Sequence, residues 1–574
     1  MYRPLVLYAI SILLGSVTSY IFLEKIYIGI IINVILIIIF YKKLEKEDFI
    51  IAMIFVFIGF MSHYNYFNFE LGEQIQGRII ECNKYKIVAT VKNRKVFLEG
   101  EGLSSLKIGD VFEAKGNFKF DIDYKNGSLG IFNIDSMNSN SDILSKVYNI
   151  KNLCYQEIEK YDEELANFVM AISLGDKSFL DYEKKGVMNT LGIIHIITVS
   201  GFHIALIYTF IEKVLNYKVA IVTTFIYITI IGYTPSTVRA FIMIFILVMS
   251  KKVYRNYDSL SSLSLAFIIL VSMKPYYILN PAFNLSFLSV LGIITMKDKF
   301  DKVLDFLPTL IKDSVSITLS ASMLTTLYMA YNFKKVNLNG IVANFLLMPF
   351  YSFLIIVSNL LLILIYIPKF NKVFIYLLKG LLLCTNTFEN FIVSNFNTVY
   401  TISYIGALTI TSMYISYIFY KKNHKNTIFI PIIMTIFTLV NMYSYYPNIS
   451  YIKTKKGTTI NISYKMNNII LSNNKVKISK IREDIKVDRI YDEIENEKNI
   501  KLNNKYNIMV KNNGKDLDLI IDDKIIITKN RKSNLDNNKA YKQVKIVEDD
   551  RNVGIGFTYD KYKLVNKNVF QVQI

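Results

Sequence analysis

Apolar runs close to 20 residues recur along most of this chain, and they restrict its fold more than any other feature. A helix needs about 20 consecutive apolar residues to cross the hydrocarbon core of a bilayer. Such runs cover residues 4–22, 26–41, 49–67, 190–213, 217–233, 235–251, 258–273, 281–297, 308–331, 338–366, 373–397, 401–420 and 426–446. We therefore predict a polytopic α-helical membrane protein with about 13 spans.

The loops between these runs indicate how the spans are oriented. Lys and Arg collect in the cytoplasmic loops of membrane proteins. With the N-terminus inside, most Lys- and Arg-rich loops fall on the cytoplasmic side, and Lys334 and Lys335 are the exception. Residues 68–188 and 450–574 then face outward. The run 308–331 is the weakest span because it is rich in Ser and Thr.

The net charge of +20 has two explanations. A basic protein can bind nucleic acid or anionic lipid. Lys-rich cytoplasmic loops, together with a general excess of Lys, Ile, Asn and Tyr, explain the charge more simply, and we favour this explanation.

The chain has three cysteines and no CxxC motif, so a structural zinc site is not expected. Cys82 and Cys154 flank the first outward-facing segment. They could form a disulfide if that segment is extracellular, and they could equally remain free thiols. We predict no cofactor and no metal site.

The first outward segment has the pattern of a small β-barrel. Short runs rich in β-branched residues occupy 77–82, 86–91 and 95–100, and a turn near 106–116 leads into another strand. About five short strands suit an OB-fold-like barrel. Its aromatic residues could stack on single-stranded nucleic acid or pack the core, and core packing is favoured. These residues are Phe97, Phe112, Phe118 and Phe120.

The tail after the last apolar run also has a β pattern, with short apolar strands among Lys and Asn. It contains no His and no Cys, so it cannot house a metal-dependent hydrolase of the usual His/Asp kind. Five parts follow from these patterns. They are N-terminal transmembrane helices (1–67), an extracellular OB-fold-like domain (68–145), an amphipathic helical connector (146–188), the main membrane domain (189–446) and a short, mostly-β extracellular C-terminal domain (447–574).

Polar side chains at membrane depth are costly and therefore suggest a functional site. The alternative is that they only hold helices together. They fall into four groups, each in the first half of a span that runs from outside to inside, as an outward-opening polar cavity would require. The groups are His195, Ser200, Gly201 and His203; Ser236 and Arg239; Asn284 and Ser286; and Asn344, ahead of a helix-breaking Pro349.

Two features of the first group bear on its chemistry. His195 and His203 are eight residues apart, which would place them near one face of a single helix about two turns apart. Ser200 and His203 are three residues apart and could meet, as a serine nucleophile and its base would.

These residues, in this order, resemble the ComEC-type DNA-uptake channels of bacterial natural competence. The resemblance covers about 1–446 and rests on five segments. They are 174–176, ending at Asp176; 192–203; Pro235-Ser236 to Arg239-Ala240; 283–287; and Ala343-Asn344 to Pro349. Many family members end in a metallo-β-lactamase-like domain, but this chain has no His-x-His-x-Asp-His motif. The resemblance therefore implies no nuclease, and we expect no enzymatic activity.

The resemblance implies a multi-pass protein of the bacterial cell membrane that imports single-stranded DNA during transformation. Its implied partners are single-stranded DNA, the bilayer, a DNA receptor, a cytoplasmic translocation ATPase and further copies of the chain. Arg239 would meet backbone phosphates, while His195, Ser200 and His203 would line or brace the pore. Asn284, Ser286 and Asn344 would hydrogen-bond across helices.

Two other functions stay open at this point. A transporter of a small solute or lipid-linked precursor could use the same outward-facing cavity. An intramembrane hydrolase could use Ser200 as its nucleophile.

Overall fold

The protein is described from a computed structural model, which divides into two compact units. One unit comprises residues 1–325 and 337–398, and the other comprises 326–336 and 399–574. The structure describes residues 3–473, except 84–85, 101–102, 104–105, 107, 141, 177–178, 334, 338, 396–398, 403, 422, 443, 455–456 and 466. Beyond 473 it describes 489–491, 494, 497–502, 506–512, 517–521, 525–528, 542–545, 558–565 and 568–571.

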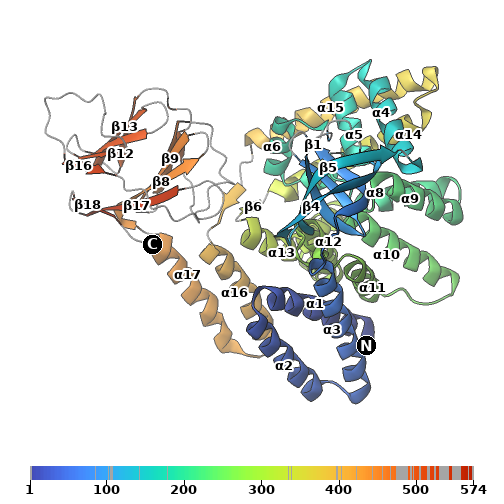
Figure 1. Ribbon diagram of the computed structural model, residues 1–574, viewed down its shortest axis with the longest axis horizontal. Coiled ribbons are helices and arrows are strands. Elements are labelled where there is room, and N and C mark those ends of the chain that lie inside the picture. The colour runs from blue at the N-terminus through green and yellow to red at the C-terminus, as the bar shows by residue number, and fades with distance from the viewer. Residues whose placement is uncertain are drawn as a thin grey trace. The chain divides into compact units, whose positions relative to one another are not determined.

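Three long apolar helices open the first unit: α1 (Pro4–Glu24), α2 (Ile26–Lys43) and α3 (Lys46–Phe67). Helices α1 and α3 lie side by side (Figure 1) and approach closely through glycines. A Cβ added at Gly15 would fall 2.0 Å from the carbonyl oxygen of Val56, and one at Gly59 would fall 2.3 Å from that of Ile12. Small residues at such crossings are typical of membrane helices.

Residues 74–140 form a closed five-stranded barrel in the order β1-β2-β3-β5-β4. Alternate residues of β4 point into its core, as the period of two requires. Phe112 lies in that core and Phe120 is exposed. The predicted barrel is confirmed, and its OB-like character stays a prediction. The strands are β1 (Gln74–Asn83), β2 (Lys86–Val91), β3 (Arg94–Gly100), β4 (Val111–Asp123) and β5 (Ser128–Asn140).

A helical region follows the barrel, and its largest core lies among α4, α5, α6, α14 and α15. Its helices are α4 (Ile143–Glu159), α5 (Glu163–Leu174), α6 (Tyr182–Leu191), α7 (Ile194–Ile197), α8 (Gly201–Val214), α9 (Tyr217–Ile231), α10 (Pro235–Lys252), α11 (Ser259–Met273), η3 (Pro275–Leu279), α12 (Pro281–Val303), α13 (Thr309–Phe333), α14 (Asn339–Leu364) and α15 (Pro368–Asn395).

Several of these helices bear on the predicted membrane spans. Among the described residues, α1, α2, α3 and α14 are long and apolar enough to cross a bilayer, and α9 and α11 are apolar but shorter. This supports a membrane protein, while the number of spans stays a prediction. Pro349 does not break the run 338–366, because α14 continues through it. The weak run 308–331 forms the continuous helix α13.

The described part of the second unit contains the C-terminal end of α13, α16 (Tyr404–Lys421), η4 (Lys425–Ile428), α17 (Phe429–Met442) and three sheets. One sheet has the order β11-β10-β9-β8-β17-β18, one has the order β12-β13-β14-β15-β16, and β6 pairs with β7. The strands are β6 (Lys335–Asn337), β7 (Val399–Thr401), β8 (Ser444–Thr454), β9 (Gly457–Lys465), β10 (Asn467–Ser472), β11 (Arg489–Tyr491), β12 (Glu497–Leu502), β13 (Tyr506–Asn512), β14 (Leu517–Ile521), β15 (Ile525–Thr528), β16 (Lys542–Lys545), β17 (Thr558–Val565) and β18 (Asn568–Gln571).

Candidate functional site

The run 190–213 is not one helix, and this changes how its two histidines are placed. Gly192 ends α6 in the left-handed conformation with φ of 73°, a backbone geometry that favours glycine. The single turn α7 carries His195, and α8 begins after Ser200 with His203 in its first turn. The prediction that both histidines share one helix face is therefore wrong.

Ser200 and His203 do meet, as the spacing predicted, but they meet as a helix cap. The Ser200 Oγ accepts a hydrogen bond from the Phe202 amide at 3.3 Å, and the Ser200 amide donates to His203 Nδ1 at 3.3 Å. Ser200 Oγ lies 3.2 Å from the same Nδ1. This reciprocal arrangement is a capping box, which satisfies the free amides at the start of α8. The pair is thus explained without a nucleophilic serine.

Arg239 is the most unusual side chain of the predicted group. It lies in the second turn of α10 and is only 6% exposed. Its Nε and Nη1 have no hydrogen-bond partner among the described residues. The guanidinium carbon lies 5.8 Å from the ring centre of Phe287 on α12. A cation–π contact offsets only part of the cost of burying an unpaired charge, so this position favours an anionic ligand.

The start of α8 reinforces that preference. A Cβ added at Gly201 would fall 2.8 Å from Arg239 Nη2 and 3.2 Å from the Cβ of Ala240. The Ser236 hydroxyl donates to the carbonyl of Val199 at 3.4 Å, which holds the two helix starts together. The N-terminal end of a helix carries a partial positive charge. A guanidinium and a helix N-terminus therefore lie side by side, and both attract anions.

The third group is placed by the turn from η3 into α12. Asn280 caps α12 by accepting from the amides of Ala282 and Phe283. Asn284 donates through Nδ2 to the carbonyl of Ile278 at 2.9 Å, so this bond braces the turn. Ser286 is half-buried beside Phe287. The structure thus brings α8, α10 and α12 together around Arg239.

Two other predicted residues, His195 and Asn344, differ in their burial. His195 is exposed, although its neighbours Ile196 and Ile197 are buried. Asn344 lies on α14, which packs against α5 and α8, and its Oδ1 is buried without a partner among the described residues.

Asp176 lies just past the end of α5 and interacts with Lys151 of α4. Burial lowers the pKa of Lys151 to about 8, and the charge of Asp176 opposes that shift. The cysteines Cys82, Cys154 and Cys384 are free thiols, so the disulfide considered between the first two is not formed.

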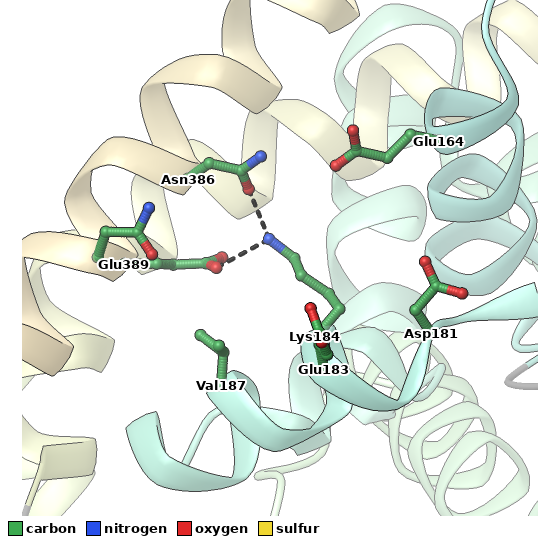
Figure 2. A pocket seen from close by; sticks show the side chains of 8 residues that line it. Glu164, Asp181, Glu183, Lys184, Val187, Asn386 and Glu389 are labelled. Carbon is green, nitrogen blue, oxygen red and sulfur yellow. Dashed lines mark hydrogen bonds and ion pairs between the residues drawn. The ribbon is translucent and has the colours of Figure 1, made fainter.

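A polar pocket of about 490 Å³ was not predicted from the sequence (Figure 2). At its wall Lys184 of α6 donates to Glu389 Oε2 of α15 at 2.8 Å and also bonds the Asn386 amide oxygen. Tyr351 of α14 donates to the other oxygen of Glu389, which is 1% exposed. Glu389 is the one acidic residue in the run 373–397, which would have marked it by the rule already applied to Arg239.

The fold and the site are those of a helix-rich protein with several helices apolar enough to cross a bilayer, a closed β-barrel and a buried cation that favours anions. Residues 172–423 match the family model described as competence protein, so the predicted resemblance to the ComEC-type family is confirmed over that segment.

Two curated relatives were found. The chain is 24% identical over 197 residues to ComE operon protein 3 of Bacillus subtilis (strain 168), covering 33% of this chain and 25% of the relative. It is 26% identical over 219 residues to an uncharacterized protein of Aquifex aeolicus (strain VF5), covering 37% and 51%. The matches therefore span between a quarter and half of these relatives. No solved structure matches the chain significantly.

Proposed function

We propose that this protein is a cell-membrane channel that imports single-stranded DNA during natural competence. The observation that carries the proposal is the buried Arg239, whose Nε and Nη1 have no partner in the described part of the chain, beside the N-terminus of α8. Both features lie within the segment that matches the competence family. The name of the Bacillus relative, ComE operon protein 3, is consistent with the same process.

The Arg239 guanidinium is suited to bind the successive phosphates of a polyanion that moves past it. A guanidinium binds phosphate oxygens through two parallel N–H groups and stays charged at any physiological pH. The phosphates of a moving strand would exchange places beside Arg239, while the exposed His195 would line the path. The protein would move DNA without changing it, so we propose transport and not enzymatic chemistry.

The wider arrangement belongs to the same proposal. The N-terminus would be cytoplasmic, with about 13 spans, and the barrel would be an extracellular OB-like domain. The mostly-β tail would also face outward. A DNA receptor would deliver the strand, a cytoplasmic ATPase would draw it in, and copies of the chain could assemble.

Transformation of a deletion strain tests the role of Arg239. We expect Arg239→Gln to lower transformation at least about tenfold, the effect of losing roughly 1.4 kcal/mol of anion stabilisation. The matched control is Arg255→Gln, which removes the same charge from an exposed loop and should transform like the wild type. Equal transformation by Arg239→Gln, at equal amounts of protein in the membrane, would refute the phosphate role.

The alternative is a transporter for a small anionic solute or a lipid-linked precursor, which the same unpaired guanidinium could hold. The two functions differ in how binding responds to salt. Single-stranded DNA should bind the full chain with an affinity that falls steeply as salt rises, because several phosphates release counterions together. A small solute with one anionic group should show a shallow dependence.

A further inference from the structure

A pair of lysines lies over adjacent tyrosine rings where the barrel meets the helices of the first unit. Lys95 Nζ, from β3, lies 5.2 Å from the ring centre of Tyr276. Lys274 Nζ, from the end of α11, lies 5.7 Å from that of Tyr277. The two ring centres are 4.9 Å apart, so both ammonium groups lie on one aromatic surface formed by Tyr276 and Tyr277.

Hydrogen bonds hold the barrel against this aromatic surface. The Tyr66 hydroxyl, at the end of α3, donates to the carbonyl of Gly127 at 2.8 Å and accepts from the Lys95 amide at 3.2 Å. A Cβ at Gly127 would fall 2.3 Å from the ring of Tyr276, so only glycine allows this approach. The arrangement of the two lysines is therefore set by packing from both sides.

The local charge balance leaves this pair without a close counterion. Among the described residues neither lysine forms an ion pair within 4.0 Å. The carboxylates of Glu81 and Asp123 act on Lys95 at longer range, and Asp123 is already bonded to the amides of its own turn. Lys92 and Arg94 add positive charge over the ring of Phe69, with the Arg94 guanidinium carbon 3.9 Å from its centre.

The two lysines also repel each other. Burial lowers the pKa of both ammonium groups, and the charge of Lys95 lowers the pKa of Lys274 further. Two ammonium groups held near each other on a rigid aromatic surface are stabilised when an anion binds between them, because the anion attracts both and offsets their mutual repulsion.

We infer that Lys95 and Lys274 bind backbone phosphates of a single DNA strand as it passes from the barrel to the membrane helices. This inference rests on the proposed function. Tyr276 and Tyr277 are only 2% and 5% exposed, so their rings cannot stack on bases, and binding at this step is independent of sequence. Protein also covers the rings, which distinguishes the pair from tyrosines exposed to lipid headgroups at a membrane surface.

Oligonucleotide binding by the full chain in nanodiscs of neutral phosphatidylcholine tests the inference. We expect Lys95→Gln/Lys274→Gln to weaken binding of labelled oligothymidylate. The slope of log affinity against log salt should become shallower by about 1.4, since each phosphate contact to a single strand contributes about 0.7. Lys95→Arg/Lys274→Arg should retain the wild-type slope. The control Lys115→Gln/Lys213→Gln removes two exposed charges and should also leave the slope unchanged.

An unchanged slope in the double glutamine variant, or an equal loss in the control, would overturn the inference. The same holds if the double variant loses co-purified phosphatidylglycerol while its oligonucleotide slope is unchanged, because the pair would then be a lipid headgroup site. Failure of the wild type to bind any oligonucleotide would instead contradict the proposed function. The two failures are thus separable.

Discussion

Arg239 has the most unusual surroundings of any single residue in the site, because no ion pair to it is found in the described part of the chain. Its Nε and Nη1 are buried without partners among the described residues, and its nearest aromatic contact is Phe287. The sequence identified Arg239 because a charge inside an apolar run is visible in any hydropathy profile. The same rule would have found Glu389, whose partners Lys184 and Tyr351 come from distant segments that no local pattern connects.

Gly201 tests whether the position of the guanidinium matters. The Cβ of Gly201→Ala would fall 2.8 Å from Arg239 Nη2, the far end of a flexible side chain. The guanidinium should therefore move while the fold persists, and DNA uptake should fall severalfold at normal protein levels. Gly186→Ala is the matched control, because an added Cβ there meets nothing within 4 Å and alanine favours a helix by about 1 kcal/mol. Equal uptake by both variants would contradict the argument.

At the scale of elements, the break between α6 and α8 explains what hydropathy could not. Gly192 and Ser200 are a helix stop and a helix start, but a continuous apolar run conceals them. At Pro349 the sequence predicted a helix break that does not exist, since α14 continues through this residue. Neighbouring helices in a membrane bundle can satisfy the backbone groups that a proline frees.

Substitution of Ser200 separates its role as a cap from a role as a nucleophile. Ser200→Ala removes the Oγ that accepts from Phe202 and should cost about 1 kcal/mol of stability. Asparagine caps helices about as well as serine but carries no hydroxyl. We expect Ser200→Asn to keep the thermal stability and the DNA uptake of the wild type. Normal stability with complete loss of function in Ser200→Asn would instead favour a nucleophile.

The ion pair between Lys184 and Glu389 joins α6 to α15, and its strength can be measured. Lys184→Met would leave a buried carboxylate without its cation, which costs about 3–5 kcal/mol in comparable sites. Adding Glu389→Gln should recover part of this loss, because the stranded charge is then removed. Thermal unfolding of the purified variants gives these differences. The exposed pair of Lys160 and Glu157 is the control, and Lys160→Met should cost no more than about 1 kcal/mol.

At the scale of the whole molecule, the parts with local periodic patterns were predicted best. The strands expected at 77–82 and 86–91 lie within β1 and β2 of a closed barrel, because alternating β-branched residues specify a half-buried strand. The contact between the barrel and Tyr276 was not predicted from the sequence. It depends on Gly127 and Tyr66, which are far from Tyr276 in the sequence and meet only through packing.

We propose that DNA crosses the membrane through this protein, and the location of labelled DNA in cells is the measurement that tests this proposal. Cells with and without the gene would be given labelled DNA, treated with external nuclease and assayed for protected label. We predict that cells lacking the protein still bind DNA at the surface but protect none, and that the wild-type gene restores protected single strands. Equal protection of labelled DNA in cells that lack the protein would show that DNA does not need this protein to cross the membrane.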